Sequence, residues 1–178
     1  MVASSKPDRL LAIYLNDHLA GATLGVELAR RLRSSNEGDP EFGQPLAEVC
    51  GEIEADRETL IRLMGRLQVV RNGVKPALAL VAERLGRLKL NGSFVSPSRL
   101  SPVIELEGLL AGITAKAAMW RALALLSGRK QAFDAEELGR LSERADRQRE
   151  VVETCRLEAA AHAFGAGSPA APPQAAAS

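Results

Sequence analysis

Apolar residues recur every three or four positions through four long stretches of this chain, the spacing that aligns side chains on one face of an α-helix. Two polar residues fall within these stripes, His18 in the first stretch and Asp56 in the second. The stripe around Asp56 consists of Leu46, Val49, Ile53, Leu60, Leu63 and Leu67. Burying a polar group without a partner costs roughly 1–3 kcal/mol. The pattern therefore predicts packed helices in which these two side chains find polar partners.

Residues that typically begin and end helices bound each of these stretches. We expect long helices over 8–33, 39–70, 101–126 and 135–164, and a shorter one over 74–90. Asp134 and Glu137 form a capping box for the last helix. Four long helices predict an all-α, antiparallel four-helix bundle. The short helix would then lie in the long connection between the second and third long helices.

The composition agrees with packed helices in a single domain. The 178 residues include one Trp, one Tyr and four Phe, and the net charge is +1, so nothing favours nucleic-acid binding. Asn16, Asp17 and His18 interrupt the longest apolar run, which excludes a membrane span, and no secretory signal is visible. A cytoplasmic protein is expected.

The sequence also predicts how the domain is organised. We expect a flexible segment over 1–7, a bundle domain over 8–164 and a disordered Ala-, Pro-, Gly- and Ser-rich tail over 165–178.

Two cysteines and two glycines lie inside the predicted helices. Cys50 and Cys155 each fall in an apolar stripe and not in a Cys-x-x-Cys pair. This placement favours reduced thiols in the core, with a disulfide between packed helices as the alternative. Gly21 and Gly25 are four residues apart in the first helix, which favours close approach of a neighbouring helix at that level.

Two segments, YLNDHLAGATLGVE over 14–27 and IELEGLLAG over 104–112, are similar to the first and third helices of the ferritin-like superfamily. The resemblance covers about 8–164 and also rests on the four long helices, the long excursion between two helix pairs and the inward-facing acids. It implies a ferritin-like bundle, a fold in which carboxylates and Glu-x-x-His pairs hold two metal ions. Glu27, Asp56 and Glu107 are the residues that would supply oxygen ligands to iron or manganese.

The histidines do not complete that metal motif, because no glutamate stands three residues before His18 or His162. We therefore predict that no cofactor is bound. We expect Asp56 to pair inside the bundle with an arginine such as Arg30 or Arg121, an arrangement that specifies helix register. A metal-binding ferritin-like oxidoreductase or metal-storage protein is the alternative.

Basic residues gather around the predicted short helix, with Glu83 the only acid among them. Together with one loop phenylalanine, this candidate interaction surface comprises Lys75, Arg84, Arg87, Lys89, Phe94 and Arg99. It suits an acidic protein partner or peripheral contact with an anionic membrane through 75–99. Alternatively, the leucine stripe of this helix covers the bundle and its charges are solvated.

Catalytic signatures are missing from the sequence: it contains no Gly-rich phosphate loop, no H-E-x-x-H and no G-x-S-x-G. Their absence disfavours an enzyme. We expect a non-enzymatic bundle that acts through protein contacts, as an accessory or scaffold protein bound to a protein partner or to a second copy of itself.

Overall fold

A computed structural model describes residues 6–71 and 99–165 of the chain, and within these residues all regular structure is helical. The helices are α1 (Lys6–Ser35), α2 (Gly43–Arg66), α4 (Ser101–Ala124) and α5 (Ala135–Phe164). The predicted all-α fold with four long, packed helices is confirmed. The predicted short helix over 74–90 lies outside the described residues, and so do most of the flexible ends predicted for 1–7 and 165–178.

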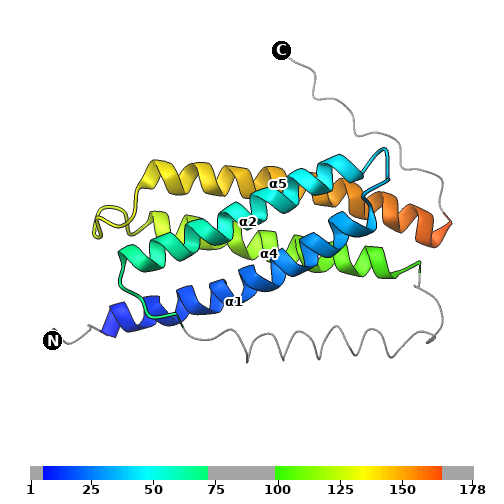
Figure 1. Cartoon of the computed structure of the whole chain (residues 1–178). Coiled ribbons are helices and arrows are strands. Elements are labelled where there is room, and N and C mark those ends of the chain that lie inside the picture. Colours follow the sequence, from blue (N-terminus) through cyan, green and yellow to red (C-terminus); the bar gives the residue numbers. More distant parts are fainter. Residues whose placement is uncertain (1–5, 72–98, 166–178) are drawn as a thin grey trace, which may run out of the picture.

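The four helices run lengthwise beside one another, and their directions alternate between neighbours (Figure 1). α1 packs against α2 and α4, and α5 packs against the same two helices. Two ion pairs agree with the antiparallel direction of α1 and α4: Arg31 lies 2.9 Å from Glu105 near the start of α4, and Asp8 lies 2.5 Å from Lys130 in the turn after α4. α2 and α4 run in the same direction, so α2 ends and α4 begins at opposite ends of the bundle (Figure 1).

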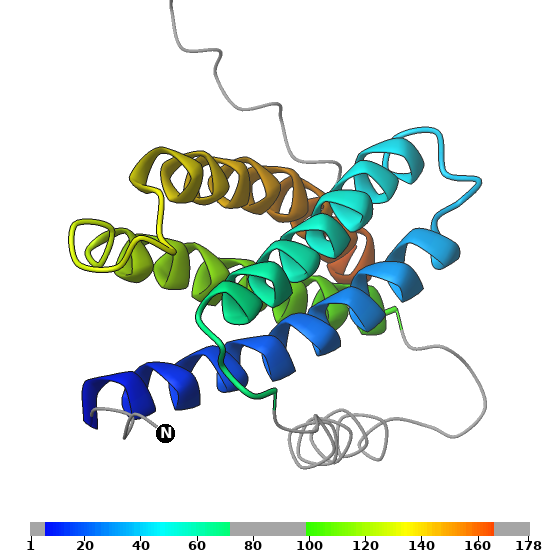
Figure 2. The ribbon, with the colours of Figure 1, turned by 60° about the vertical axis from the view of Figure 1, so that its left-hand side comes forward.

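The core divides into two apolar clusters, and α2 contributes five residues of the predicted stripe to them: Leu46, Val49, Ile53, Leu60 and Leu63. In Figure 2 the α1–α2 pair crosses the α4–α5 pair at an angle. One cluster surrounds Trp120, which is fully buried, and the other contains Cys50 and Cys155. Both cysteines are buried and free, so the prediction of reduced core thiols is confirmed and the alternative disulfide is wrong.

None of the four helices combines the length and apolar composition that a bilayer-spanning helix requires.

Local hydrogen bonds explain where the helices differ from their predicted bounds. α2 begins at Gly43 and not at Asp39, because the Asp39 carboxylate accepts hydrogen bonds from the backbone N–H groups of Glu41 and Phe42 and so forms a separate turn. α2 ends before 70 because Gln68 has φ 54°, which no helix residue adopts. The predicted limits of the last helix are confirmed.

Asp134 caps the start of α5 as predicted, through one hydrogen bond of the capping box. The Asp134 carboxylate accepts a hydrogen bond of 2.8 Å from the Glu137 N–H. Gly165 closes the helix in the left-handed conformation, with φ 70°.

Candidate functional site

Asp56 on α2 is the most deeply buried charged residue among those described, with 1% of its surface exposed. Lys116 Nζ on α4 donates to Asp56 Oδ2 at 2.5 Å, and Arg144 on α5 pairs with the other carboxylate oxygen. Three helices therefore meet at one carboxylate. The predicted burial of Asp56 with a cationic partner is confirmed.

An amide extends this cluster. Gln148 on α5 is also 1% exposed, and its Oε1 accepts a hydrogen bond of 2.5 Å from Lys116 Nζ. Its Nε2 donates to Glu52 Oε2 at 2.8 Å and to Asp56 Oδ2 at 3.3 Å. We call Glu52, Asp56, Lys116, Arg144 and Gln148 the buried ion cluster. It holds two acids and two bases, so their formal charges cancel. Burial lowers the pKa of Lys116, against the attraction of Asp56.

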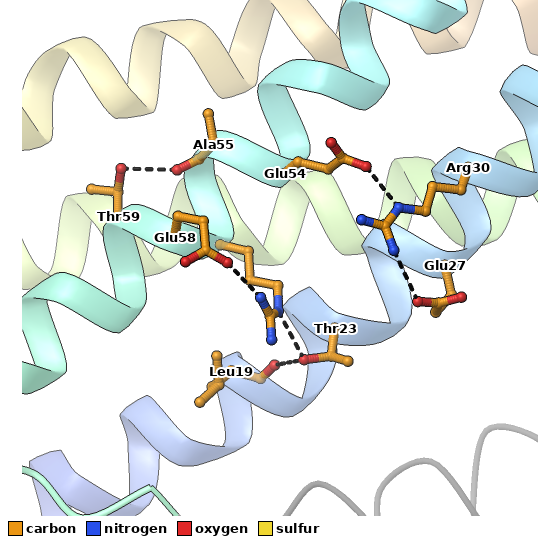
Figure 3. Close-up of polar contacts among 9 residues, drawn as sticks. Leu19, Thr23, Glu27, Arg30, Glu54, Ala55, Glu58 and Thr59 are labelled. Carbon is orange, nitrogen blue, oxygen red and sulfur yellow. Dashed lines mark hydrogen bonds and ion pairs between the residues drawn. The ribbon is translucent and has the colours of Figure 1, made fainter.

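The predicted partners of Asp56 are wrong, because both arginines engage other acids. Arg30 Nε donates to Glu54 at 2.7 Å and its Nη1 lies 3.5 Å from Glu27 (Figure 3). Arg121 pairs with Asp146. Spacing along a helix places Asp56 on the inner face, but it does not determine which of several cations on the other helices reaches it. Lys116 and Arg144 carried no separate signal in the sequence.

The structure does not bring the three metal candidates together. The side chains of Glu27 and Glu107 are more than half exposed. Glu27 pairs with Arg30 and Glu107 pairs with Arg156 on the outside of the bundle. Asp56, by contrast, lies in the buried ion cluster. Across the described parts of the chain, no group of three or more His, Cys, Asp and Glu side chains is placed to hold a metal ion. Within the proposed interaction surface, only Arg99 falls among the described residues, exposed in the turn before α4.

His18 is half-buried, and among the described residues its side chain contacts an aromatic ring and not the polar partner that was predicted. Its ring packs edge-on against Tyr14, with 4.5 Å between ring centroids. Burial lowers the pKa of His18, and the charge of Asp17 opposes this effect only in part. The neutral imidazole is therefore favoured.

His18 and Tyr14 belong to the wall of a cavity of about 430 Å³ between α1, α2 and α4. Most of this wall is apolar, formed by Ile53, Leu60, Leu109, Ile113 and Met119 together with alanines. Asp17, Asp56, Arg57 and Lys116 contribute its polar part. Small-molecule sites typically measure about 300–1,000 Å³ and combine apolar walls with a few polar groups. The cavity has the size and the lining of such a site.

Three helix-interior glycines form part of this wall, Gly21 and Gly25 on α1 and Gly112 on α4. Among the described residues outside the helix's own turn, a Cβ atom added to any of them would meet no atom within 4 Å. The prediction that Gly21 and Gly25 allow close helix approach is therefore wrong: what they leave beside the helix is open space. Helix-interior glycine costs roughly 0.5–1 kcal/mol relative to alanine, and at these positions no close backbone contact offsets that cost.

The cavity could not be found from the sequence, because a glycine in a helix is equally consistent with a close contact and with a void. A weak signal did exist. The chain's single Tyr and single Trp both line the cavity, as does one of its two His.

Comparison with known proteins adds no family assignment. No protein-family model, curated protein or solved structure matches the chain significantly.

Proposed function

We propose that this chain is a non-enzymatic, ferritin-like helical bundle that works by binding a small molecule in the cavity between α1, α2 and α4. The observation that carries this proposal is the cavity wall, in which Gly21, Gly25 and Gly112 leave open space beside apolar side chains. This space opens to solvent, since Gly21 and Gly112 are exposed and Gly25 is half-buried. A ligand seated there would cover the apolar wall, remove its surface from water and gain packing contacts.

The direction of the helices supports the ferritin-like part of the proposal. Ferritin-like bundles have one long connection that returns the chain along the bundle. Here α2 ends and α4 begins at opposite ends, and α2 and α4 run in the same direction (Figure 1).

A neutral fluorescent probe tests the binding function. N-phenyl-1-naphthylamine emits strongly only in apolar surroundings, so its emission should rise on mixing with the folded protein. Gly25→Leu should fill the cavity and weaken probe binding about tenfold or more, equivalent to about 1.4 kcal/mol. The matched control is Gly51→Leu, at an exposed α2 position with open space outside the cavity. Equal probe binding by both variants, or no emission rise with folded wild-type protein, would refute the proposal.

A second candidate function, contact with a protein partner or a second copy, is supported by the apolar end of the bundle. At the end where α1 begins and α2 and α4 finish, large apolar side chains are exposed: Leu10, Ile13, Val70 and Leu125. The last two are 80% and 82% exposed. Exposed apolar patches commonly mark contact sites. Sedimentation velocity at increasing concentration should show self-association that Leu125→Asp removes; a monomer at every concentration would exclude the second copy.

Metal binding, the alternative function, gains less support from the geometry, since Glu27, Asp56 and Glu107 each have cationic partners and lie apart. Elemental analysis of protein purified without a metal-affinity tag should find less than one transition metal per chain. Stoichiometric iron or manganese that disappears in Glu107→Ala would instead favour the metalloprotein.

A further inference from the structure

The cavity between α1, α2 and α4 has an apolar floor and an open mouth. Its floor consists of buried side chains from α2 and α4: Ile53, Leu60, Leu109, Ile113 and Met119. Its mouth is lined by exposed residues of α1 and α4: Asp17, Gly21, Gly112 and Ala115. A bound molecule can therefore bury an apolar part on the floor while another part stays in contact with water at the mouth.

The lysine and the arginine of the cavity wall already have acidic partners. Lys116 Nζ lies 2.5 Å from Asp56 Oδ2, inside the buried ion cluster, whose formal charges cancel. Arg57 Nη1 lies 2.6 Å from Glu58 Oε1, and Arg57 Nε donates to Thr23 Oγ1 at 3.3 Å. Neither cation therefore offers an uncommitted positive charge to a ligand in the cavity.

Asp17 carries the uncommitted charge of the cavity wall. Its side chain is exposed at the mouth, and among the described residues its carboxylate forms no ion pair and no hydrogen bond. The neighbouring His18 does not neutralise it, because burial lowers the pKa of that imidazole and favours the neutral form. Gly21, one helical turn further along α1, leaves open space beside Asp17. The mouth thus offers a negative charge that a ligand can reach.

We infer that the cavity binds an amphipathic cation, a molecule whose apolar body lies on the floor and whose ammonium group pairs with Asp17 at the mouth. This inference rests on the proposed function, because it specifies the ligand of the same cavity. Burial of the apolar body supplies the affinity, and the Asp17 carboxylate selects for positive charge. An anionic ligand would place its charge beside Asp17 and be repelled.

Two probes with the same naphthalene body test the inference. 1-Naphthylmethylamine is positively charged at neutral pH, whereas 1-naphthylmethanol is neutral. Each is used to displace N-phenyl-1-naphthylamine from the full chain and from Asp17→Asn, which keeps the shape of the side chain and removes its charge. Asp17→Asn should weaken binding of the amine about fivefold, as a partly exposed ion pair predicts, and leave binding of the alcohol unchanged.

A matched variant and added salt serve as controls. Glu48→Gln removes an exposed acid of α2 outside the cavity wall, so it should change neither affinity. Added sodium chloride should weaken binding of the amine to the wild-type chain, because it screens the ion pair with Asp17, and should not weaken binding of the alcohol.

The outcomes separate the inference from the proposed function. If Asp17→Asn weakens binding of the amine no more than it weakens binding of the alcohol, or no more than Glu48→Gln does, the inference is overturned while cavity binding stands. Failure of N-phenyl-1-naphthylamine to bind overturns the proposed function itself. If Asp17→Asn does not fold, the salt dependence of the wild-type chain replaces it, and equal salt responses of the two probes would overturn the inference.

Discussion

Lys116 and Asp56 form a 2.5 Å ion pair in the wall of the cavity between α1, α2 and α4. The same ammonium donates to Gln148 Oε1 at 2.5 Å, so one side chain joins α4 to both α2 and α5. The cavity and the buried ion cluster thus share a wall. The ion cluster holds that wall in place while the glycines leave space beside it.

Removing the central carboxylate should destabilise the fold strongly. Asp56→Ala leaves Lys116 and Arg144 without their counter-charge, and we expect a loss of about 3–5 kcal/mol in the free energy of unfolding. Asp56→Asn should cost less, because it keeps the shape and part of the hydrogen bonding. Urea denaturation monitored by circular dichroism measures both.

Asp146→Ala is the matched control for this experiment. Its ion pair with Arg121 is partly exposed, and such pairs contribute about 1 kcal/mol or less. If Asp56→Ala lowered the free energy of unfolding no more than this control does, the buried ion cluster would not stabilise the packing of α2, α4 and α5.

Two glycines of α2 should respond to alanine in opposite directions. At Gly51 a Cβ meets open space, so Gly51→Ala should stabilise the protein by about 0.5–1 kcal/mol. At Gly43 a Cβ would lie 2.8 Å from the backbone oxygen of Asn36, so Gly43→Ala should destabilise it. Thermal denaturation of both variants measures these changes, and shifts in the same direction would contradict the close packing at the α1–α2 turn.

His18 should make stability depend on pH between neutral and mildly acidic conditions. Because burial lowers the pKa of His18 in the folded state, the unfolded chain binds more protons below its ordinary pKa of 6.5. Stability should therefore fall as the pH drops through 6.5 towards the lowered pKa. His18→Gln should lose the part of this pH dependence that comes from His18. Comparing the free energy of unfolding of both proteins at pH 7.5 and pH 5.5 measures the difference. An equal pH response in the variant would contradict the assignment to His18.

The core thiols should be inert in the native protein. Burial raises the pKa of Cys155 to about 11 and also raises that of Cys50. Reaction with a thiol-specific disulfide reagent at pH 8 should be slow in buffer and complete in denaturant. Since the unfolded thiol ionises near pH 9.0, stability should also fall between pH 9 and 11. Rapid modification of the folded chain would show that these thiols are accessible.

The sequence predicted the fold well, because helical spacing and capping residues act locally. The predicted limits of α5 and the burial of Asp56 both follow from such local patterns. The partners of Asp56 did not follow, since Lys116 and Arg144 lie on other helices and their register depends on the whole bundle. The cavity could not be predicted either, because it depends on how α1, α2 and α4 pack against one another, which no local pattern records.

The most direct test of cavity binding follows amide and indole resonances of the full ¹⁵N-labelled chain during titration with N-phenyl-1-naphthylamine. The single Trp gives one indole N–H signal, which identifies Trp120 without further assignment. We predict that this signal shifts, because Trp120 lies beside the cavity, and that the largest amide shifts fall on Gly21, Gly25 and Gly112, the glycines of the cavity wall. Shifts confined to other surfaces, with the Trp120 signal unmoved, would contradict the binding function proposed for the cavity.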